Sequence, residues 1–135
     1  MILVDSSAWL EYDRATGSVV DQRLTELIRT DGPVAYTEPV LMEVLAGARG
    51  DARASDLRRM LLRFQLLRFD PVADFDAAAG IYLSCRRVGV TPRGLIDCMI
   101  ASVAGRFGAT LLARDIDLNR VAAVVGIGLD PASMA

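Results

Sequence analysis

The sequence begins MILVDSS (residues 1–7), a short apolar run of β-type residues that ends directly at Asp5. The same arrangement returns near the other end of the chain, where ATLLARD (residues 109–115) carries an apolar run up to Asp115. Between them, short β-type runs alternate with stretches of helical periodicity. This alternation is typical of a parallel sheet whose strands are joined by helices, so we expect an α/β fold.

The remaining elements follow from hydrophobic periodicity and from turn residues. We expect further strands at residues 34–36, 67–69 and 127–129. Apolar residues at i, i+3, i+4 and i+7 spacing predict helices near residues 7–12, 20–28, 38–48, 57–64, 74–88, 95–107 and 118–125. Thr37 is the expected N-cap of the third helix. The helix over 95–107 is expected to turn Ile96, Met99, Ile100, Val103 and Phe107 inward.

Composition excludes several classes of function. With 135 residues, 53% of them hydrophobic, the chain is long enough for one folded domain with its own core. No apolar run approaches the roughly 20 residues of a membrane span, and no signal peptide is visible, so we expect a cytoplasmic protein without membrane contact. Histidine is absent, which excludes Ser-His-Asp and Cys-His catalysis and histidine-ligated zinc. The two cysteines, Cys85 and Cys98, are expected to be buried thiols.

The charged residues give less information about binding partners than the composition gives about function. The formal net charge of −2 argues against broad attraction to nucleic acid. All 15 basic residues are arginine, whose planar forks suit phosphate and carboxylate groups. A GC-rich genome explains the same choice without any function.

Most of the 17 acidic residues are expected to be solvated, and Asp21, Glu26, Asp51 and Asp56 are examples. Asp5 and Asp115 differ because each directly follows a predicted strand, and ligand sites of parallel sheets form outside the carboxyl ends of the strands. Both are also good N-caps for the helices that follow. Asp117, two residues beyond Asp115, is open to the same two interpretations.

Two further acids lie on helices. Asp97 is in the first turn of a strongly apolar helix, where the helix dipole offers a structural explanation. Glu43 is in mid-helix, one position from the apolar stripe, where it either points along the edge of the sheet or merely reaches for water. Four such carboxylates together would repel one another, and a divalent cation removes that penalty. An all-oxygen ligand set favours Mg²⁺ or Mn²⁺ and suits phosphoryl chemistry.

The order and spacing of four segments resemble the PIN domain, and specifically the VapC toxins of bacterial toxin–antitoxin pairs. These segments are VDSSAWL (residues 4–10), EPVLMEVLAG (38–47), RGLIDCMIA (93–101) and ARDID (113–117). The resemblance implies a single PIN domain over residues 1–135, a three-layer α/β/α sandwich around a parallel sheet of about five strands. It further implies a Mg²⁺- or Mn²⁺-dependent endoribonuclease that cleaves structured RNA, such as tRNA or rRNA, and inhibits translation and growth. A neutralising VapB-type antitoxin and a homodimer are also implied.

Carried over by position, the acidic quartet is Asp5, Glu43, Asp97 and Asp115, with Asp117 as a frequent fifth acid and Ser7 as a polar residue that hydrogen-bonds within the site. The family's usual Asp-Thr-Ser is Asp-Ser-Ser here, which keeps the hydroxyl. We expect Asp5, Asp97 and Asp115 to ligate the principal metal. Glu43 is expected to orient the attacking water, and Asp117 to assist a second metal. Arg93 and Arg114 either contact RNA phosphates or form ion pairs with the same acids.

Other interpretations of these acids remain open. A metal-dependent phosphatase or DNA nuclease would use the same carboxylates. A non-catalytic module would offer them as a docking surface for a basic peptide. The acids are otherwise caps and surface charges of a structural domain.

Overall fold

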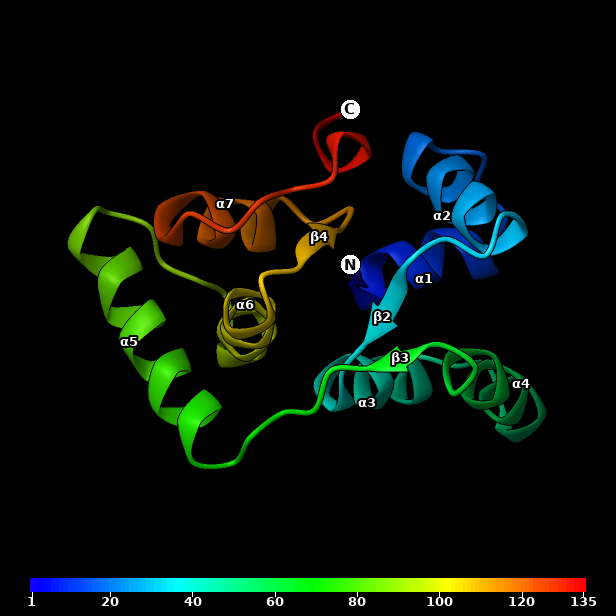
Figure 1. Ribbon diagram of the computed structural model, residues 1–135, viewed down its shortest axis with the longest axis horizontal. Helices are drawn as coiled ribbons and strands as arrows, with labels where there is room; N and C mark the ends of the chain where they lie inside the picture. Colours follow the sequence, from blue (N-terminus) through cyan, green and yellow to red (C-terminus); the bar gives the residue numbers. More distant parts are fainter.

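The computed structural model describes residues 1–135 and contains a parallel sheet flanked by helices (Figure 1). The strands are β1 (Ile2–Val4), β2 (Val34–Tyr36), β3 (Gln65–Leu66) and β4 (Thr110–Leu112). The helices are α1 (Ser6–Asp13), α2 (Val19–Arg29), α3 (Glu38–Ala46), α4 (Asp51–Leu61), α5 (Ala73–Arg87), α6 (Leu95–Phe107) and α7 (Ile116–Val125), and a short 3-10 helix η1 (Pro131–Met134) ends the chain. None of these helices is both long and apolar enough to cross a membrane.

The sheet has the strand order β3-β2-β1-β4, and all neighbouring pairs are parallel. β1 is central: Leu3 is in register with Ala35 of β2 and with Leu111 of β4. The chain steps outward from β1 to β3 and then returns to place β4 on the other side of β1. Such a reversal of strand order opens a crevice at the carboxyl ends of the two strands that flank it, here β1 and β4.

The expected fold class is confirmed, but the sheet has four strands rather than about five. The predicted strand at 127–129 is reduced to a single parallel bridge between Leu129 and Leu111. Its pairing stops at once because Asp130 caps η1 through Ala132 N, and Pro131 has no N–H to continue a ladder.

The predicted strand at 67–69 is also displaced, because β3 ends at Leu66. The Leu67 N–H still donates to the Tyr36 carbonyl at 2.8 Å, but the Phe69 N–H donates to Glu38 Oε1 instead of to the sheet. Thr37 occupies the N-cap position of α3 as expected, yet its side chain makes no capping hydrogen bond.

The core gathers around the sheet and Trp9, which is 1% exposed and contacts the rings of Tyr12 and Phe64. α5, α6 and α7 pack against one another at one end of the molecule, where they enclose a smaller cluster of Cys85, Ala101 and Val121 (Figure 1). The inward face of α6 is therefore wider than predicted: Ile100 and Val103 are buried as expected, and a second row faces the neighbouring helices. Both cysteines are buried and free, as predicted.

Three acids outside the predicted site, Asp21, Asp74 and Asp130, are buried as well. Asp21 was expected to be solvated, which is wrong: it is 8% exposed and accepts hydrogen bonds from Gly17 N and Thr25 Oγ1. Asp74 is 1% exposed.

Asp74 ties α5 to α6. It accepts hydrogen bonds from Ser102 Oγ at 2.6 Å and from Arg106 Nη2 at 2.6 Å. Burial alone would raise the pKa of Asp74, but these donors outweigh it and hold the pKa below its ordinary value. The ionised pair therefore contributes to the stability of the helical end of the molecule.

We predict that Arg106→Met lowers the free energy of unfolding by about 3 kcal/mol, because it leaves the Asp74 charge buried without its partner. Urea unfolding at pH 7 measures the loss. Arg58→Met, at an exposed arginine without an ion pair, serves as the control and should change stability little. Equal losses in the two variants would show that the Asp74–Arg106 pair is not stabilising.

Candidate active site

The pairing of β1 with β4 brings two strand-end acids side by side. Val4 is in register with Leu112, and the Asp5 N–H donates to the Leu112 carbonyl at 2.9 Å. Asp5 therefore lies at the same edge of the sheet as Asp115, which comes three residues after Leu112. Both then cap a helix, Asp5 that of α1 and Asp115 that of α7.

The capping interpretation is thus correct, but it uses only part of each carboxylate. Asp5 Oδ2 accepts from Ser7 N at 3.0 Å and from Ser7 Oγ at 2.6 Å. Asp5 Oδ1 is buried and has no hydrogen-bond partner at all. Burial raises the pKa of Asp5 despite the two bonds from Ser7. A buried oxygen without a donor is costly, and a cation beside it would remove that cost.

Asp97 and Glu43 reach the same region from α6 and α3. Burial, followed by the charges of Asp115, Asp5 and Glu43, raises the pKa of Asp97 to about 7. Burial and then the Asp5 charge raise the pKa of Glu43 as well. These charges act on one another, so the four acids of the predicted quartet lie in the same region of the structure, although no three of them are close enough to enclose an ion.

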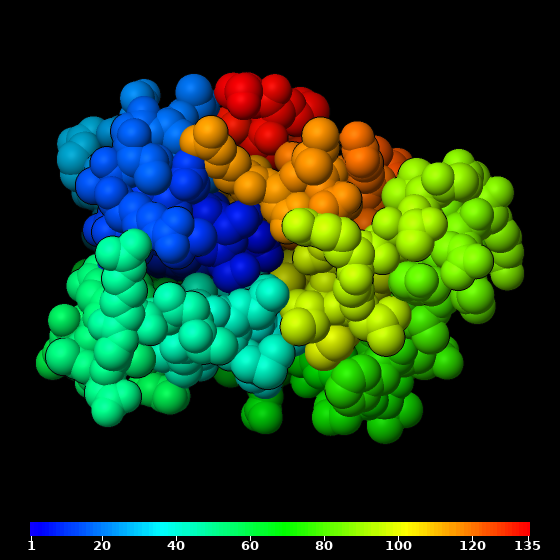
Figure 2. Space-filling view, turned by 180° about the vertical axis from the view of Figure 1, so that it is seen from behind, coloured from blue at the N-terminus to red at the C-terminus, as the bar shows by residue number.

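Figure 2 shows how the chain accomplishes this convergence. On one face of the molecule the N-terminal segment (dark blue), the start of α3 (cyan), the segment entering α6 (yellow) and the turn after β4 (orange) meet around a hollow. These segments are far apart in sequence, and three of them follow strands β1, β2 and β4.

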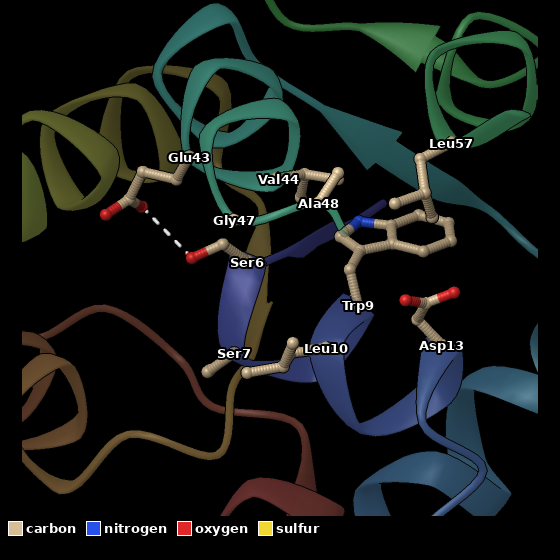
Figure 3. Close-up of a pocket in the computed structure, with 10 residues that line it drawn as sticks. All are labelled: Ser6, Ser7, Trp9, Leu10, Asp13, Glu43, Val44, Gly47, Ala48 and Leu57. Carbon is tan, nitrogen blue, oxygen red and sulfur yellow. Dashed lines mark hydrogen bonds between the residues drawn. The ribbon is translucent and has the colours of Figure 1, made fainter. Parts of the chain in front are cut away.

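Ser7 links the two sides of this edge. Its hydroxyl donates to Asp5 Oδ2 and accepts from the Arg114 N–H at 2.9 Å, so it joins the start of α1 to the turn after β4. Ser6, which the sequence analysis did not single out, donates to Glu43 Oε1 at 3.1 Å (Figure 3). Its place between two site residues in the Asp-Ser-Ser motif is the feature that would have identified it.

The two arginines take different roles. Arg93 pairs with the acids: its Nε lies 2.5 Å from Asp117 Oδ2, and its Nη2 lies 3.4 Å from Asp115 Oδ1. The side chain of Arg114 pairs instead with Glu11, which the sequence analysis did not anticipate, so the expected ion pair with the site acids is wrong for Arg114. Glu11 draws that guanidinium along α1 and away from the carboxylates.

The residues present fit a hard divalent cation. The donors are all carboxylate oxygens, and Asp5 Oδ1 lacks any partner within the protein. As the side chains stand, no three acids are close enough to enclose an ion, and the single positive charge of Arg93 is shared between Asp115 and Asp117. Mg²⁺ needs no such enclosure, since it keeps several waters and takes only one or two carboxylates directly.

Beside the acids lies a hollow of about 260 Å³ between α1, α3 and α4 (Figure 3). Glu43 and Ser6 stand at one end of it, and Asp13 and Leu57 at the other. Its middle is apolar and is formed by Trp9, Leu10, Val44 and Ala48. The hollow was not predicted from the sequence, because most of its apolar wall, including Trp9 and Val44, also belongs to the core.

Comparison with known proteins assigns the family. The sequence model of the PIN domain matches residues 2–124. The chain is 41% identical to ribonuclease VapC11 of Mycobacterium tuberculosis over 128 aligned residues. The alignment covers 94% of this chain and 96% of that protein. The chain therefore belongs to the PIN-domain family, and within it to the VapC ribonucleases.

Solved structures agree on the fold. A DNA-bound VapBC complex from Salmonella typhimurium aligns with a TM-score of 0.72 at 20% identity, over 96% of both chains. VapC20 of Mycobacterium tuberculosis, described as a sarcin-ricin loop cleaving toxin, aligns with a TM-score of 0.66 at 19% identity, over 88% of this chain and 93% of that one. At these identities the similarity shows the fold alone.

We predict that Asp97→Asn stabilises the metal-free protein at high pH. The pKa of Asp97 is about 7 in the folded protein and about 3.9 in an unfolded chain. The folded state thus binds the proton more tightly, and the free energy of unfolding falls as pH rises between these values. Removing the charge should add on the order of 1–2 kcal/mol above pH 7, after allowance for solvent screening, and little below pH ~4.

Chemical denaturation in a chelator across this pH range measures the effect. Asp76→Asn is a matched control, because Asp76 is also in the first turn of a helix but is exposed. If the free energy of unfolding of Asp97→Asn at pH 8 is equal to or lower than that of the parent, the proposed repulsion between the carboxylates is wrong.

We further predict that Arg93→Gln increases the affinity for Mn²⁺ by about 3- to 10-fold, the equivalent of ~0.7–1.4 kcal/mol. The guanidinium pairs with both Asp115 and Asp117, so a cation must compete with it for these acids. Titration calorimetry measures the affinity, and metal-free thermal unfolding should show a slightly less stable variant. Arg87→Gln removes the same charge from an exposed, unpaired site on α5. A Mn²⁺ affinity of Arg93→Gln no higher than that of Arg87→Gln would refute the competition.

Proposed function

We propose that the chain, as a single PIN domain, is a Mg²⁺- or Mn²⁺-dependent endoribonuclease toxin of the VapC type. The observation that carries the proposal is the convergence of Asp5, Glu43, Asp97 and Asp115 at the carboxyl edge of the sheet, with Asp5 Oδ1 buried and unpartnered. Membership of the VapC ribonucleases supports RNA as the substrate.

In this mechanism Asp5, Asp97 and Asp115 would hold the principal metal directly or through water, and Asp117 would assist a second ion. Such a cation, when bound, would supply Lewis acidity that activates water and offsets negative charge on the leaving oxygen. The sheet supplies rigid placement: the backbone bond from Asp5 to Leu112 and the Ser7 bridge to Arg114 keep Asp5 and Asp115 at a constant separation.

Glu43 is suited to orient the attacking water and to accept its proton. Ser6 occupies Glu43 Oε1, which leaves the other oxygen available. Burial and the neighbouring charges raise the pKa of Glu43. A carboxylate whose pKa is raised is a stronger base, which favours proton transfer from water near neutral pH. Arg93 would leave its acids when the metal binds and become free to contact an RNA phosphate.

The biological setting follows from the same family. Structures of similar fold are VapBC complexes, and we propose that a VapB-type antitoxin neutralises this chain by binding at the acidic site. We also propose a homodimer that acts in the cytoplasm, cleaves tRNA or rRNA and thereby inhibits translation and growth. VapC20 has a similar fold and is described as a toxin that cleaves the sarcin-ricin loop. This similarity supports the proposal that the target is a structured RNA.

We predict that purified, antitoxin-free protein cleaves total RNA in Mn²⁺ and not in chelator. Asp97→Asn should lower the rate at least ~100-fold, because it removes one metal-holding charge. Asp76→Asn should cleave as the parent does. Sequencing of the RNA ends after brief expression then locates the cut.

The same assay separates the alternatives. Duplex DNA and p-nitrophenyl phosphate, tested in parallel, should be poor substrates; faster turnover of either would make the protein a DNA nuclease or a phosphatase. Failure to cleave RNA with any divalent ion, together with Mn²⁺ binding absent from calorimetry, would leave the acids as a docking surface or as caps.

A further inference from the structure

The hollow beside the carboxylates continues into a second one. The second hollow, of about 570 Å³, is lined by Leu10, Asp13, Arg14, Gly47, Arg49 and Arg53. It shares Leu10, Asp13 and Gly47 with the first. The two therefore form one trough. It leads from Glu43 and Ser6, past the apolar wall around Leu10 (Figure 3), and continues to the three arginines of the second hollow.

The far end of this trough carries a net positive charge. Eight of the 15 arginines form ion pairs with acids, namely Arg23, Arg29, Arg53, Arg59, Arg68, Arg93, Arg106 and Arg114. Arg53 pairs with Asp13, so the one acid that lines the second hollow is neutralised. Arg14 and Arg49 are exposed and form no ion pair, which leaves two free guanidinium groups there.

The spacing suits a strand of RNA. Arg14 follows α1 directly and is eight residues from Ser6, which at ~1.5 Å per residue is about 12 Å along the helix. A stacked strand advances about 3.4 Å per nucleotide, so this length covers three or four nucleotides. Leu10 is 38% exposed between the two ends and offers an apolar surface to a base or sugar.

We propose that Arg14 and Arg49 bind backbone phosphates of the RNA substrate, three to four nucleotides from the bond that is cut. The inference rests on the proposed ribonuclease function and extends it, because it identifies the path by which the strand leaves the carboxylates. Guanidinium forks bind phosphate in a bidentate manner, and such contacts position a strand without reading its sequence. The chain's net charge of −2 makes this local positive end the more necessary, since the molecule as a whole repels RNA.

The test compares two double variants in the Asp97→Asn background, which we expect to bind RNA without cutting it. Arg14→Gln/Arg49→Gln removes the proposed phosphate contacts. Arg58→Gln/Arg87→Gln removes the same charge from exposed, unpaired arginines that do not line the trough. The probe is a fluorescein-labelled, single-stranded 12-nucleotide RNA of mixed sequence, titrated in Mn²⁺ at several salt concentrations.

We expect Arg14→Gln/Arg49→Gln to bind the RNA about 10-fold or more weakly than the control. The slope of log affinity against log salt should also shrink by about 1.4, since each single-strand phosphate contact contributes about 0.7. With Asp97 restored, the same variant should cut the 12-nucleotide RNA with a raised KM and an unchanged kcat, which shows that the site is intact.

Affinity and salt slope equal to those of the control would overturn the inference. A parent protein that cuts no RNA in Mn²⁺ would overturn the proposed function itself. The two failures are therefore distinguishable.

Discussion

The parallel pairing of β1 with β4 is the constraint on which the rest of the molecule depends. Each strand has only three residues, and each ends close to an aspartate. Because the strands are parallel and in register, Asp5 and Asp115 must emerge at the same edge, and the reversal of strand order at β1 opens a crevice there. α3 and α6 then need only pack against the sheet to present Glu43 and Asp97.

That arrangement places repulsive groups together, and the surrounding structure moderates the repulsion. Ser7 satisfies one oxygen of Asp5, Ser6 one oxygen of Glu43, and Arg93 the charges of Asp115 and Asp117. These hydrogen bonds and the exposed arginine reduce the repulsion only in part, as the raised pKa of Asp97 indicates. A divalent cation is the remedy that also performs chemistry, which is why such crowding is typical of functional sites.

Much of the fold, and the acids at the strand ends, could be predicted from the sequence, because both depend on local sequence patterns. Ile2–Val4 and Val34–Tyr36 appear as strands where alternating β and helical runs predicted them. The errors lie where a tertiary contact competes with local pattern. Glu38 takes the Phe69 N–H from the sheet and shortens β3, and Asp130 ends the terminal pairing by capping η1. Neither contact leaves a trace in hydrophobic periodicity.

The sequence by itself determined the element types, the strand-end acids and the absence of histidine chemistry, since these depend on residue identity and spacing along the chain. Only the tertiary structure decided which groups are satisfied and which are free. It left Asp5 Oδ1 without a partner, paired Arg114 with Glu11, and kept Arg14 and Arg49 unpaired in one trough. Such outcomes depend on distances between segments far apart in sequence, and these distances exist only after the sheet has brought the segments together.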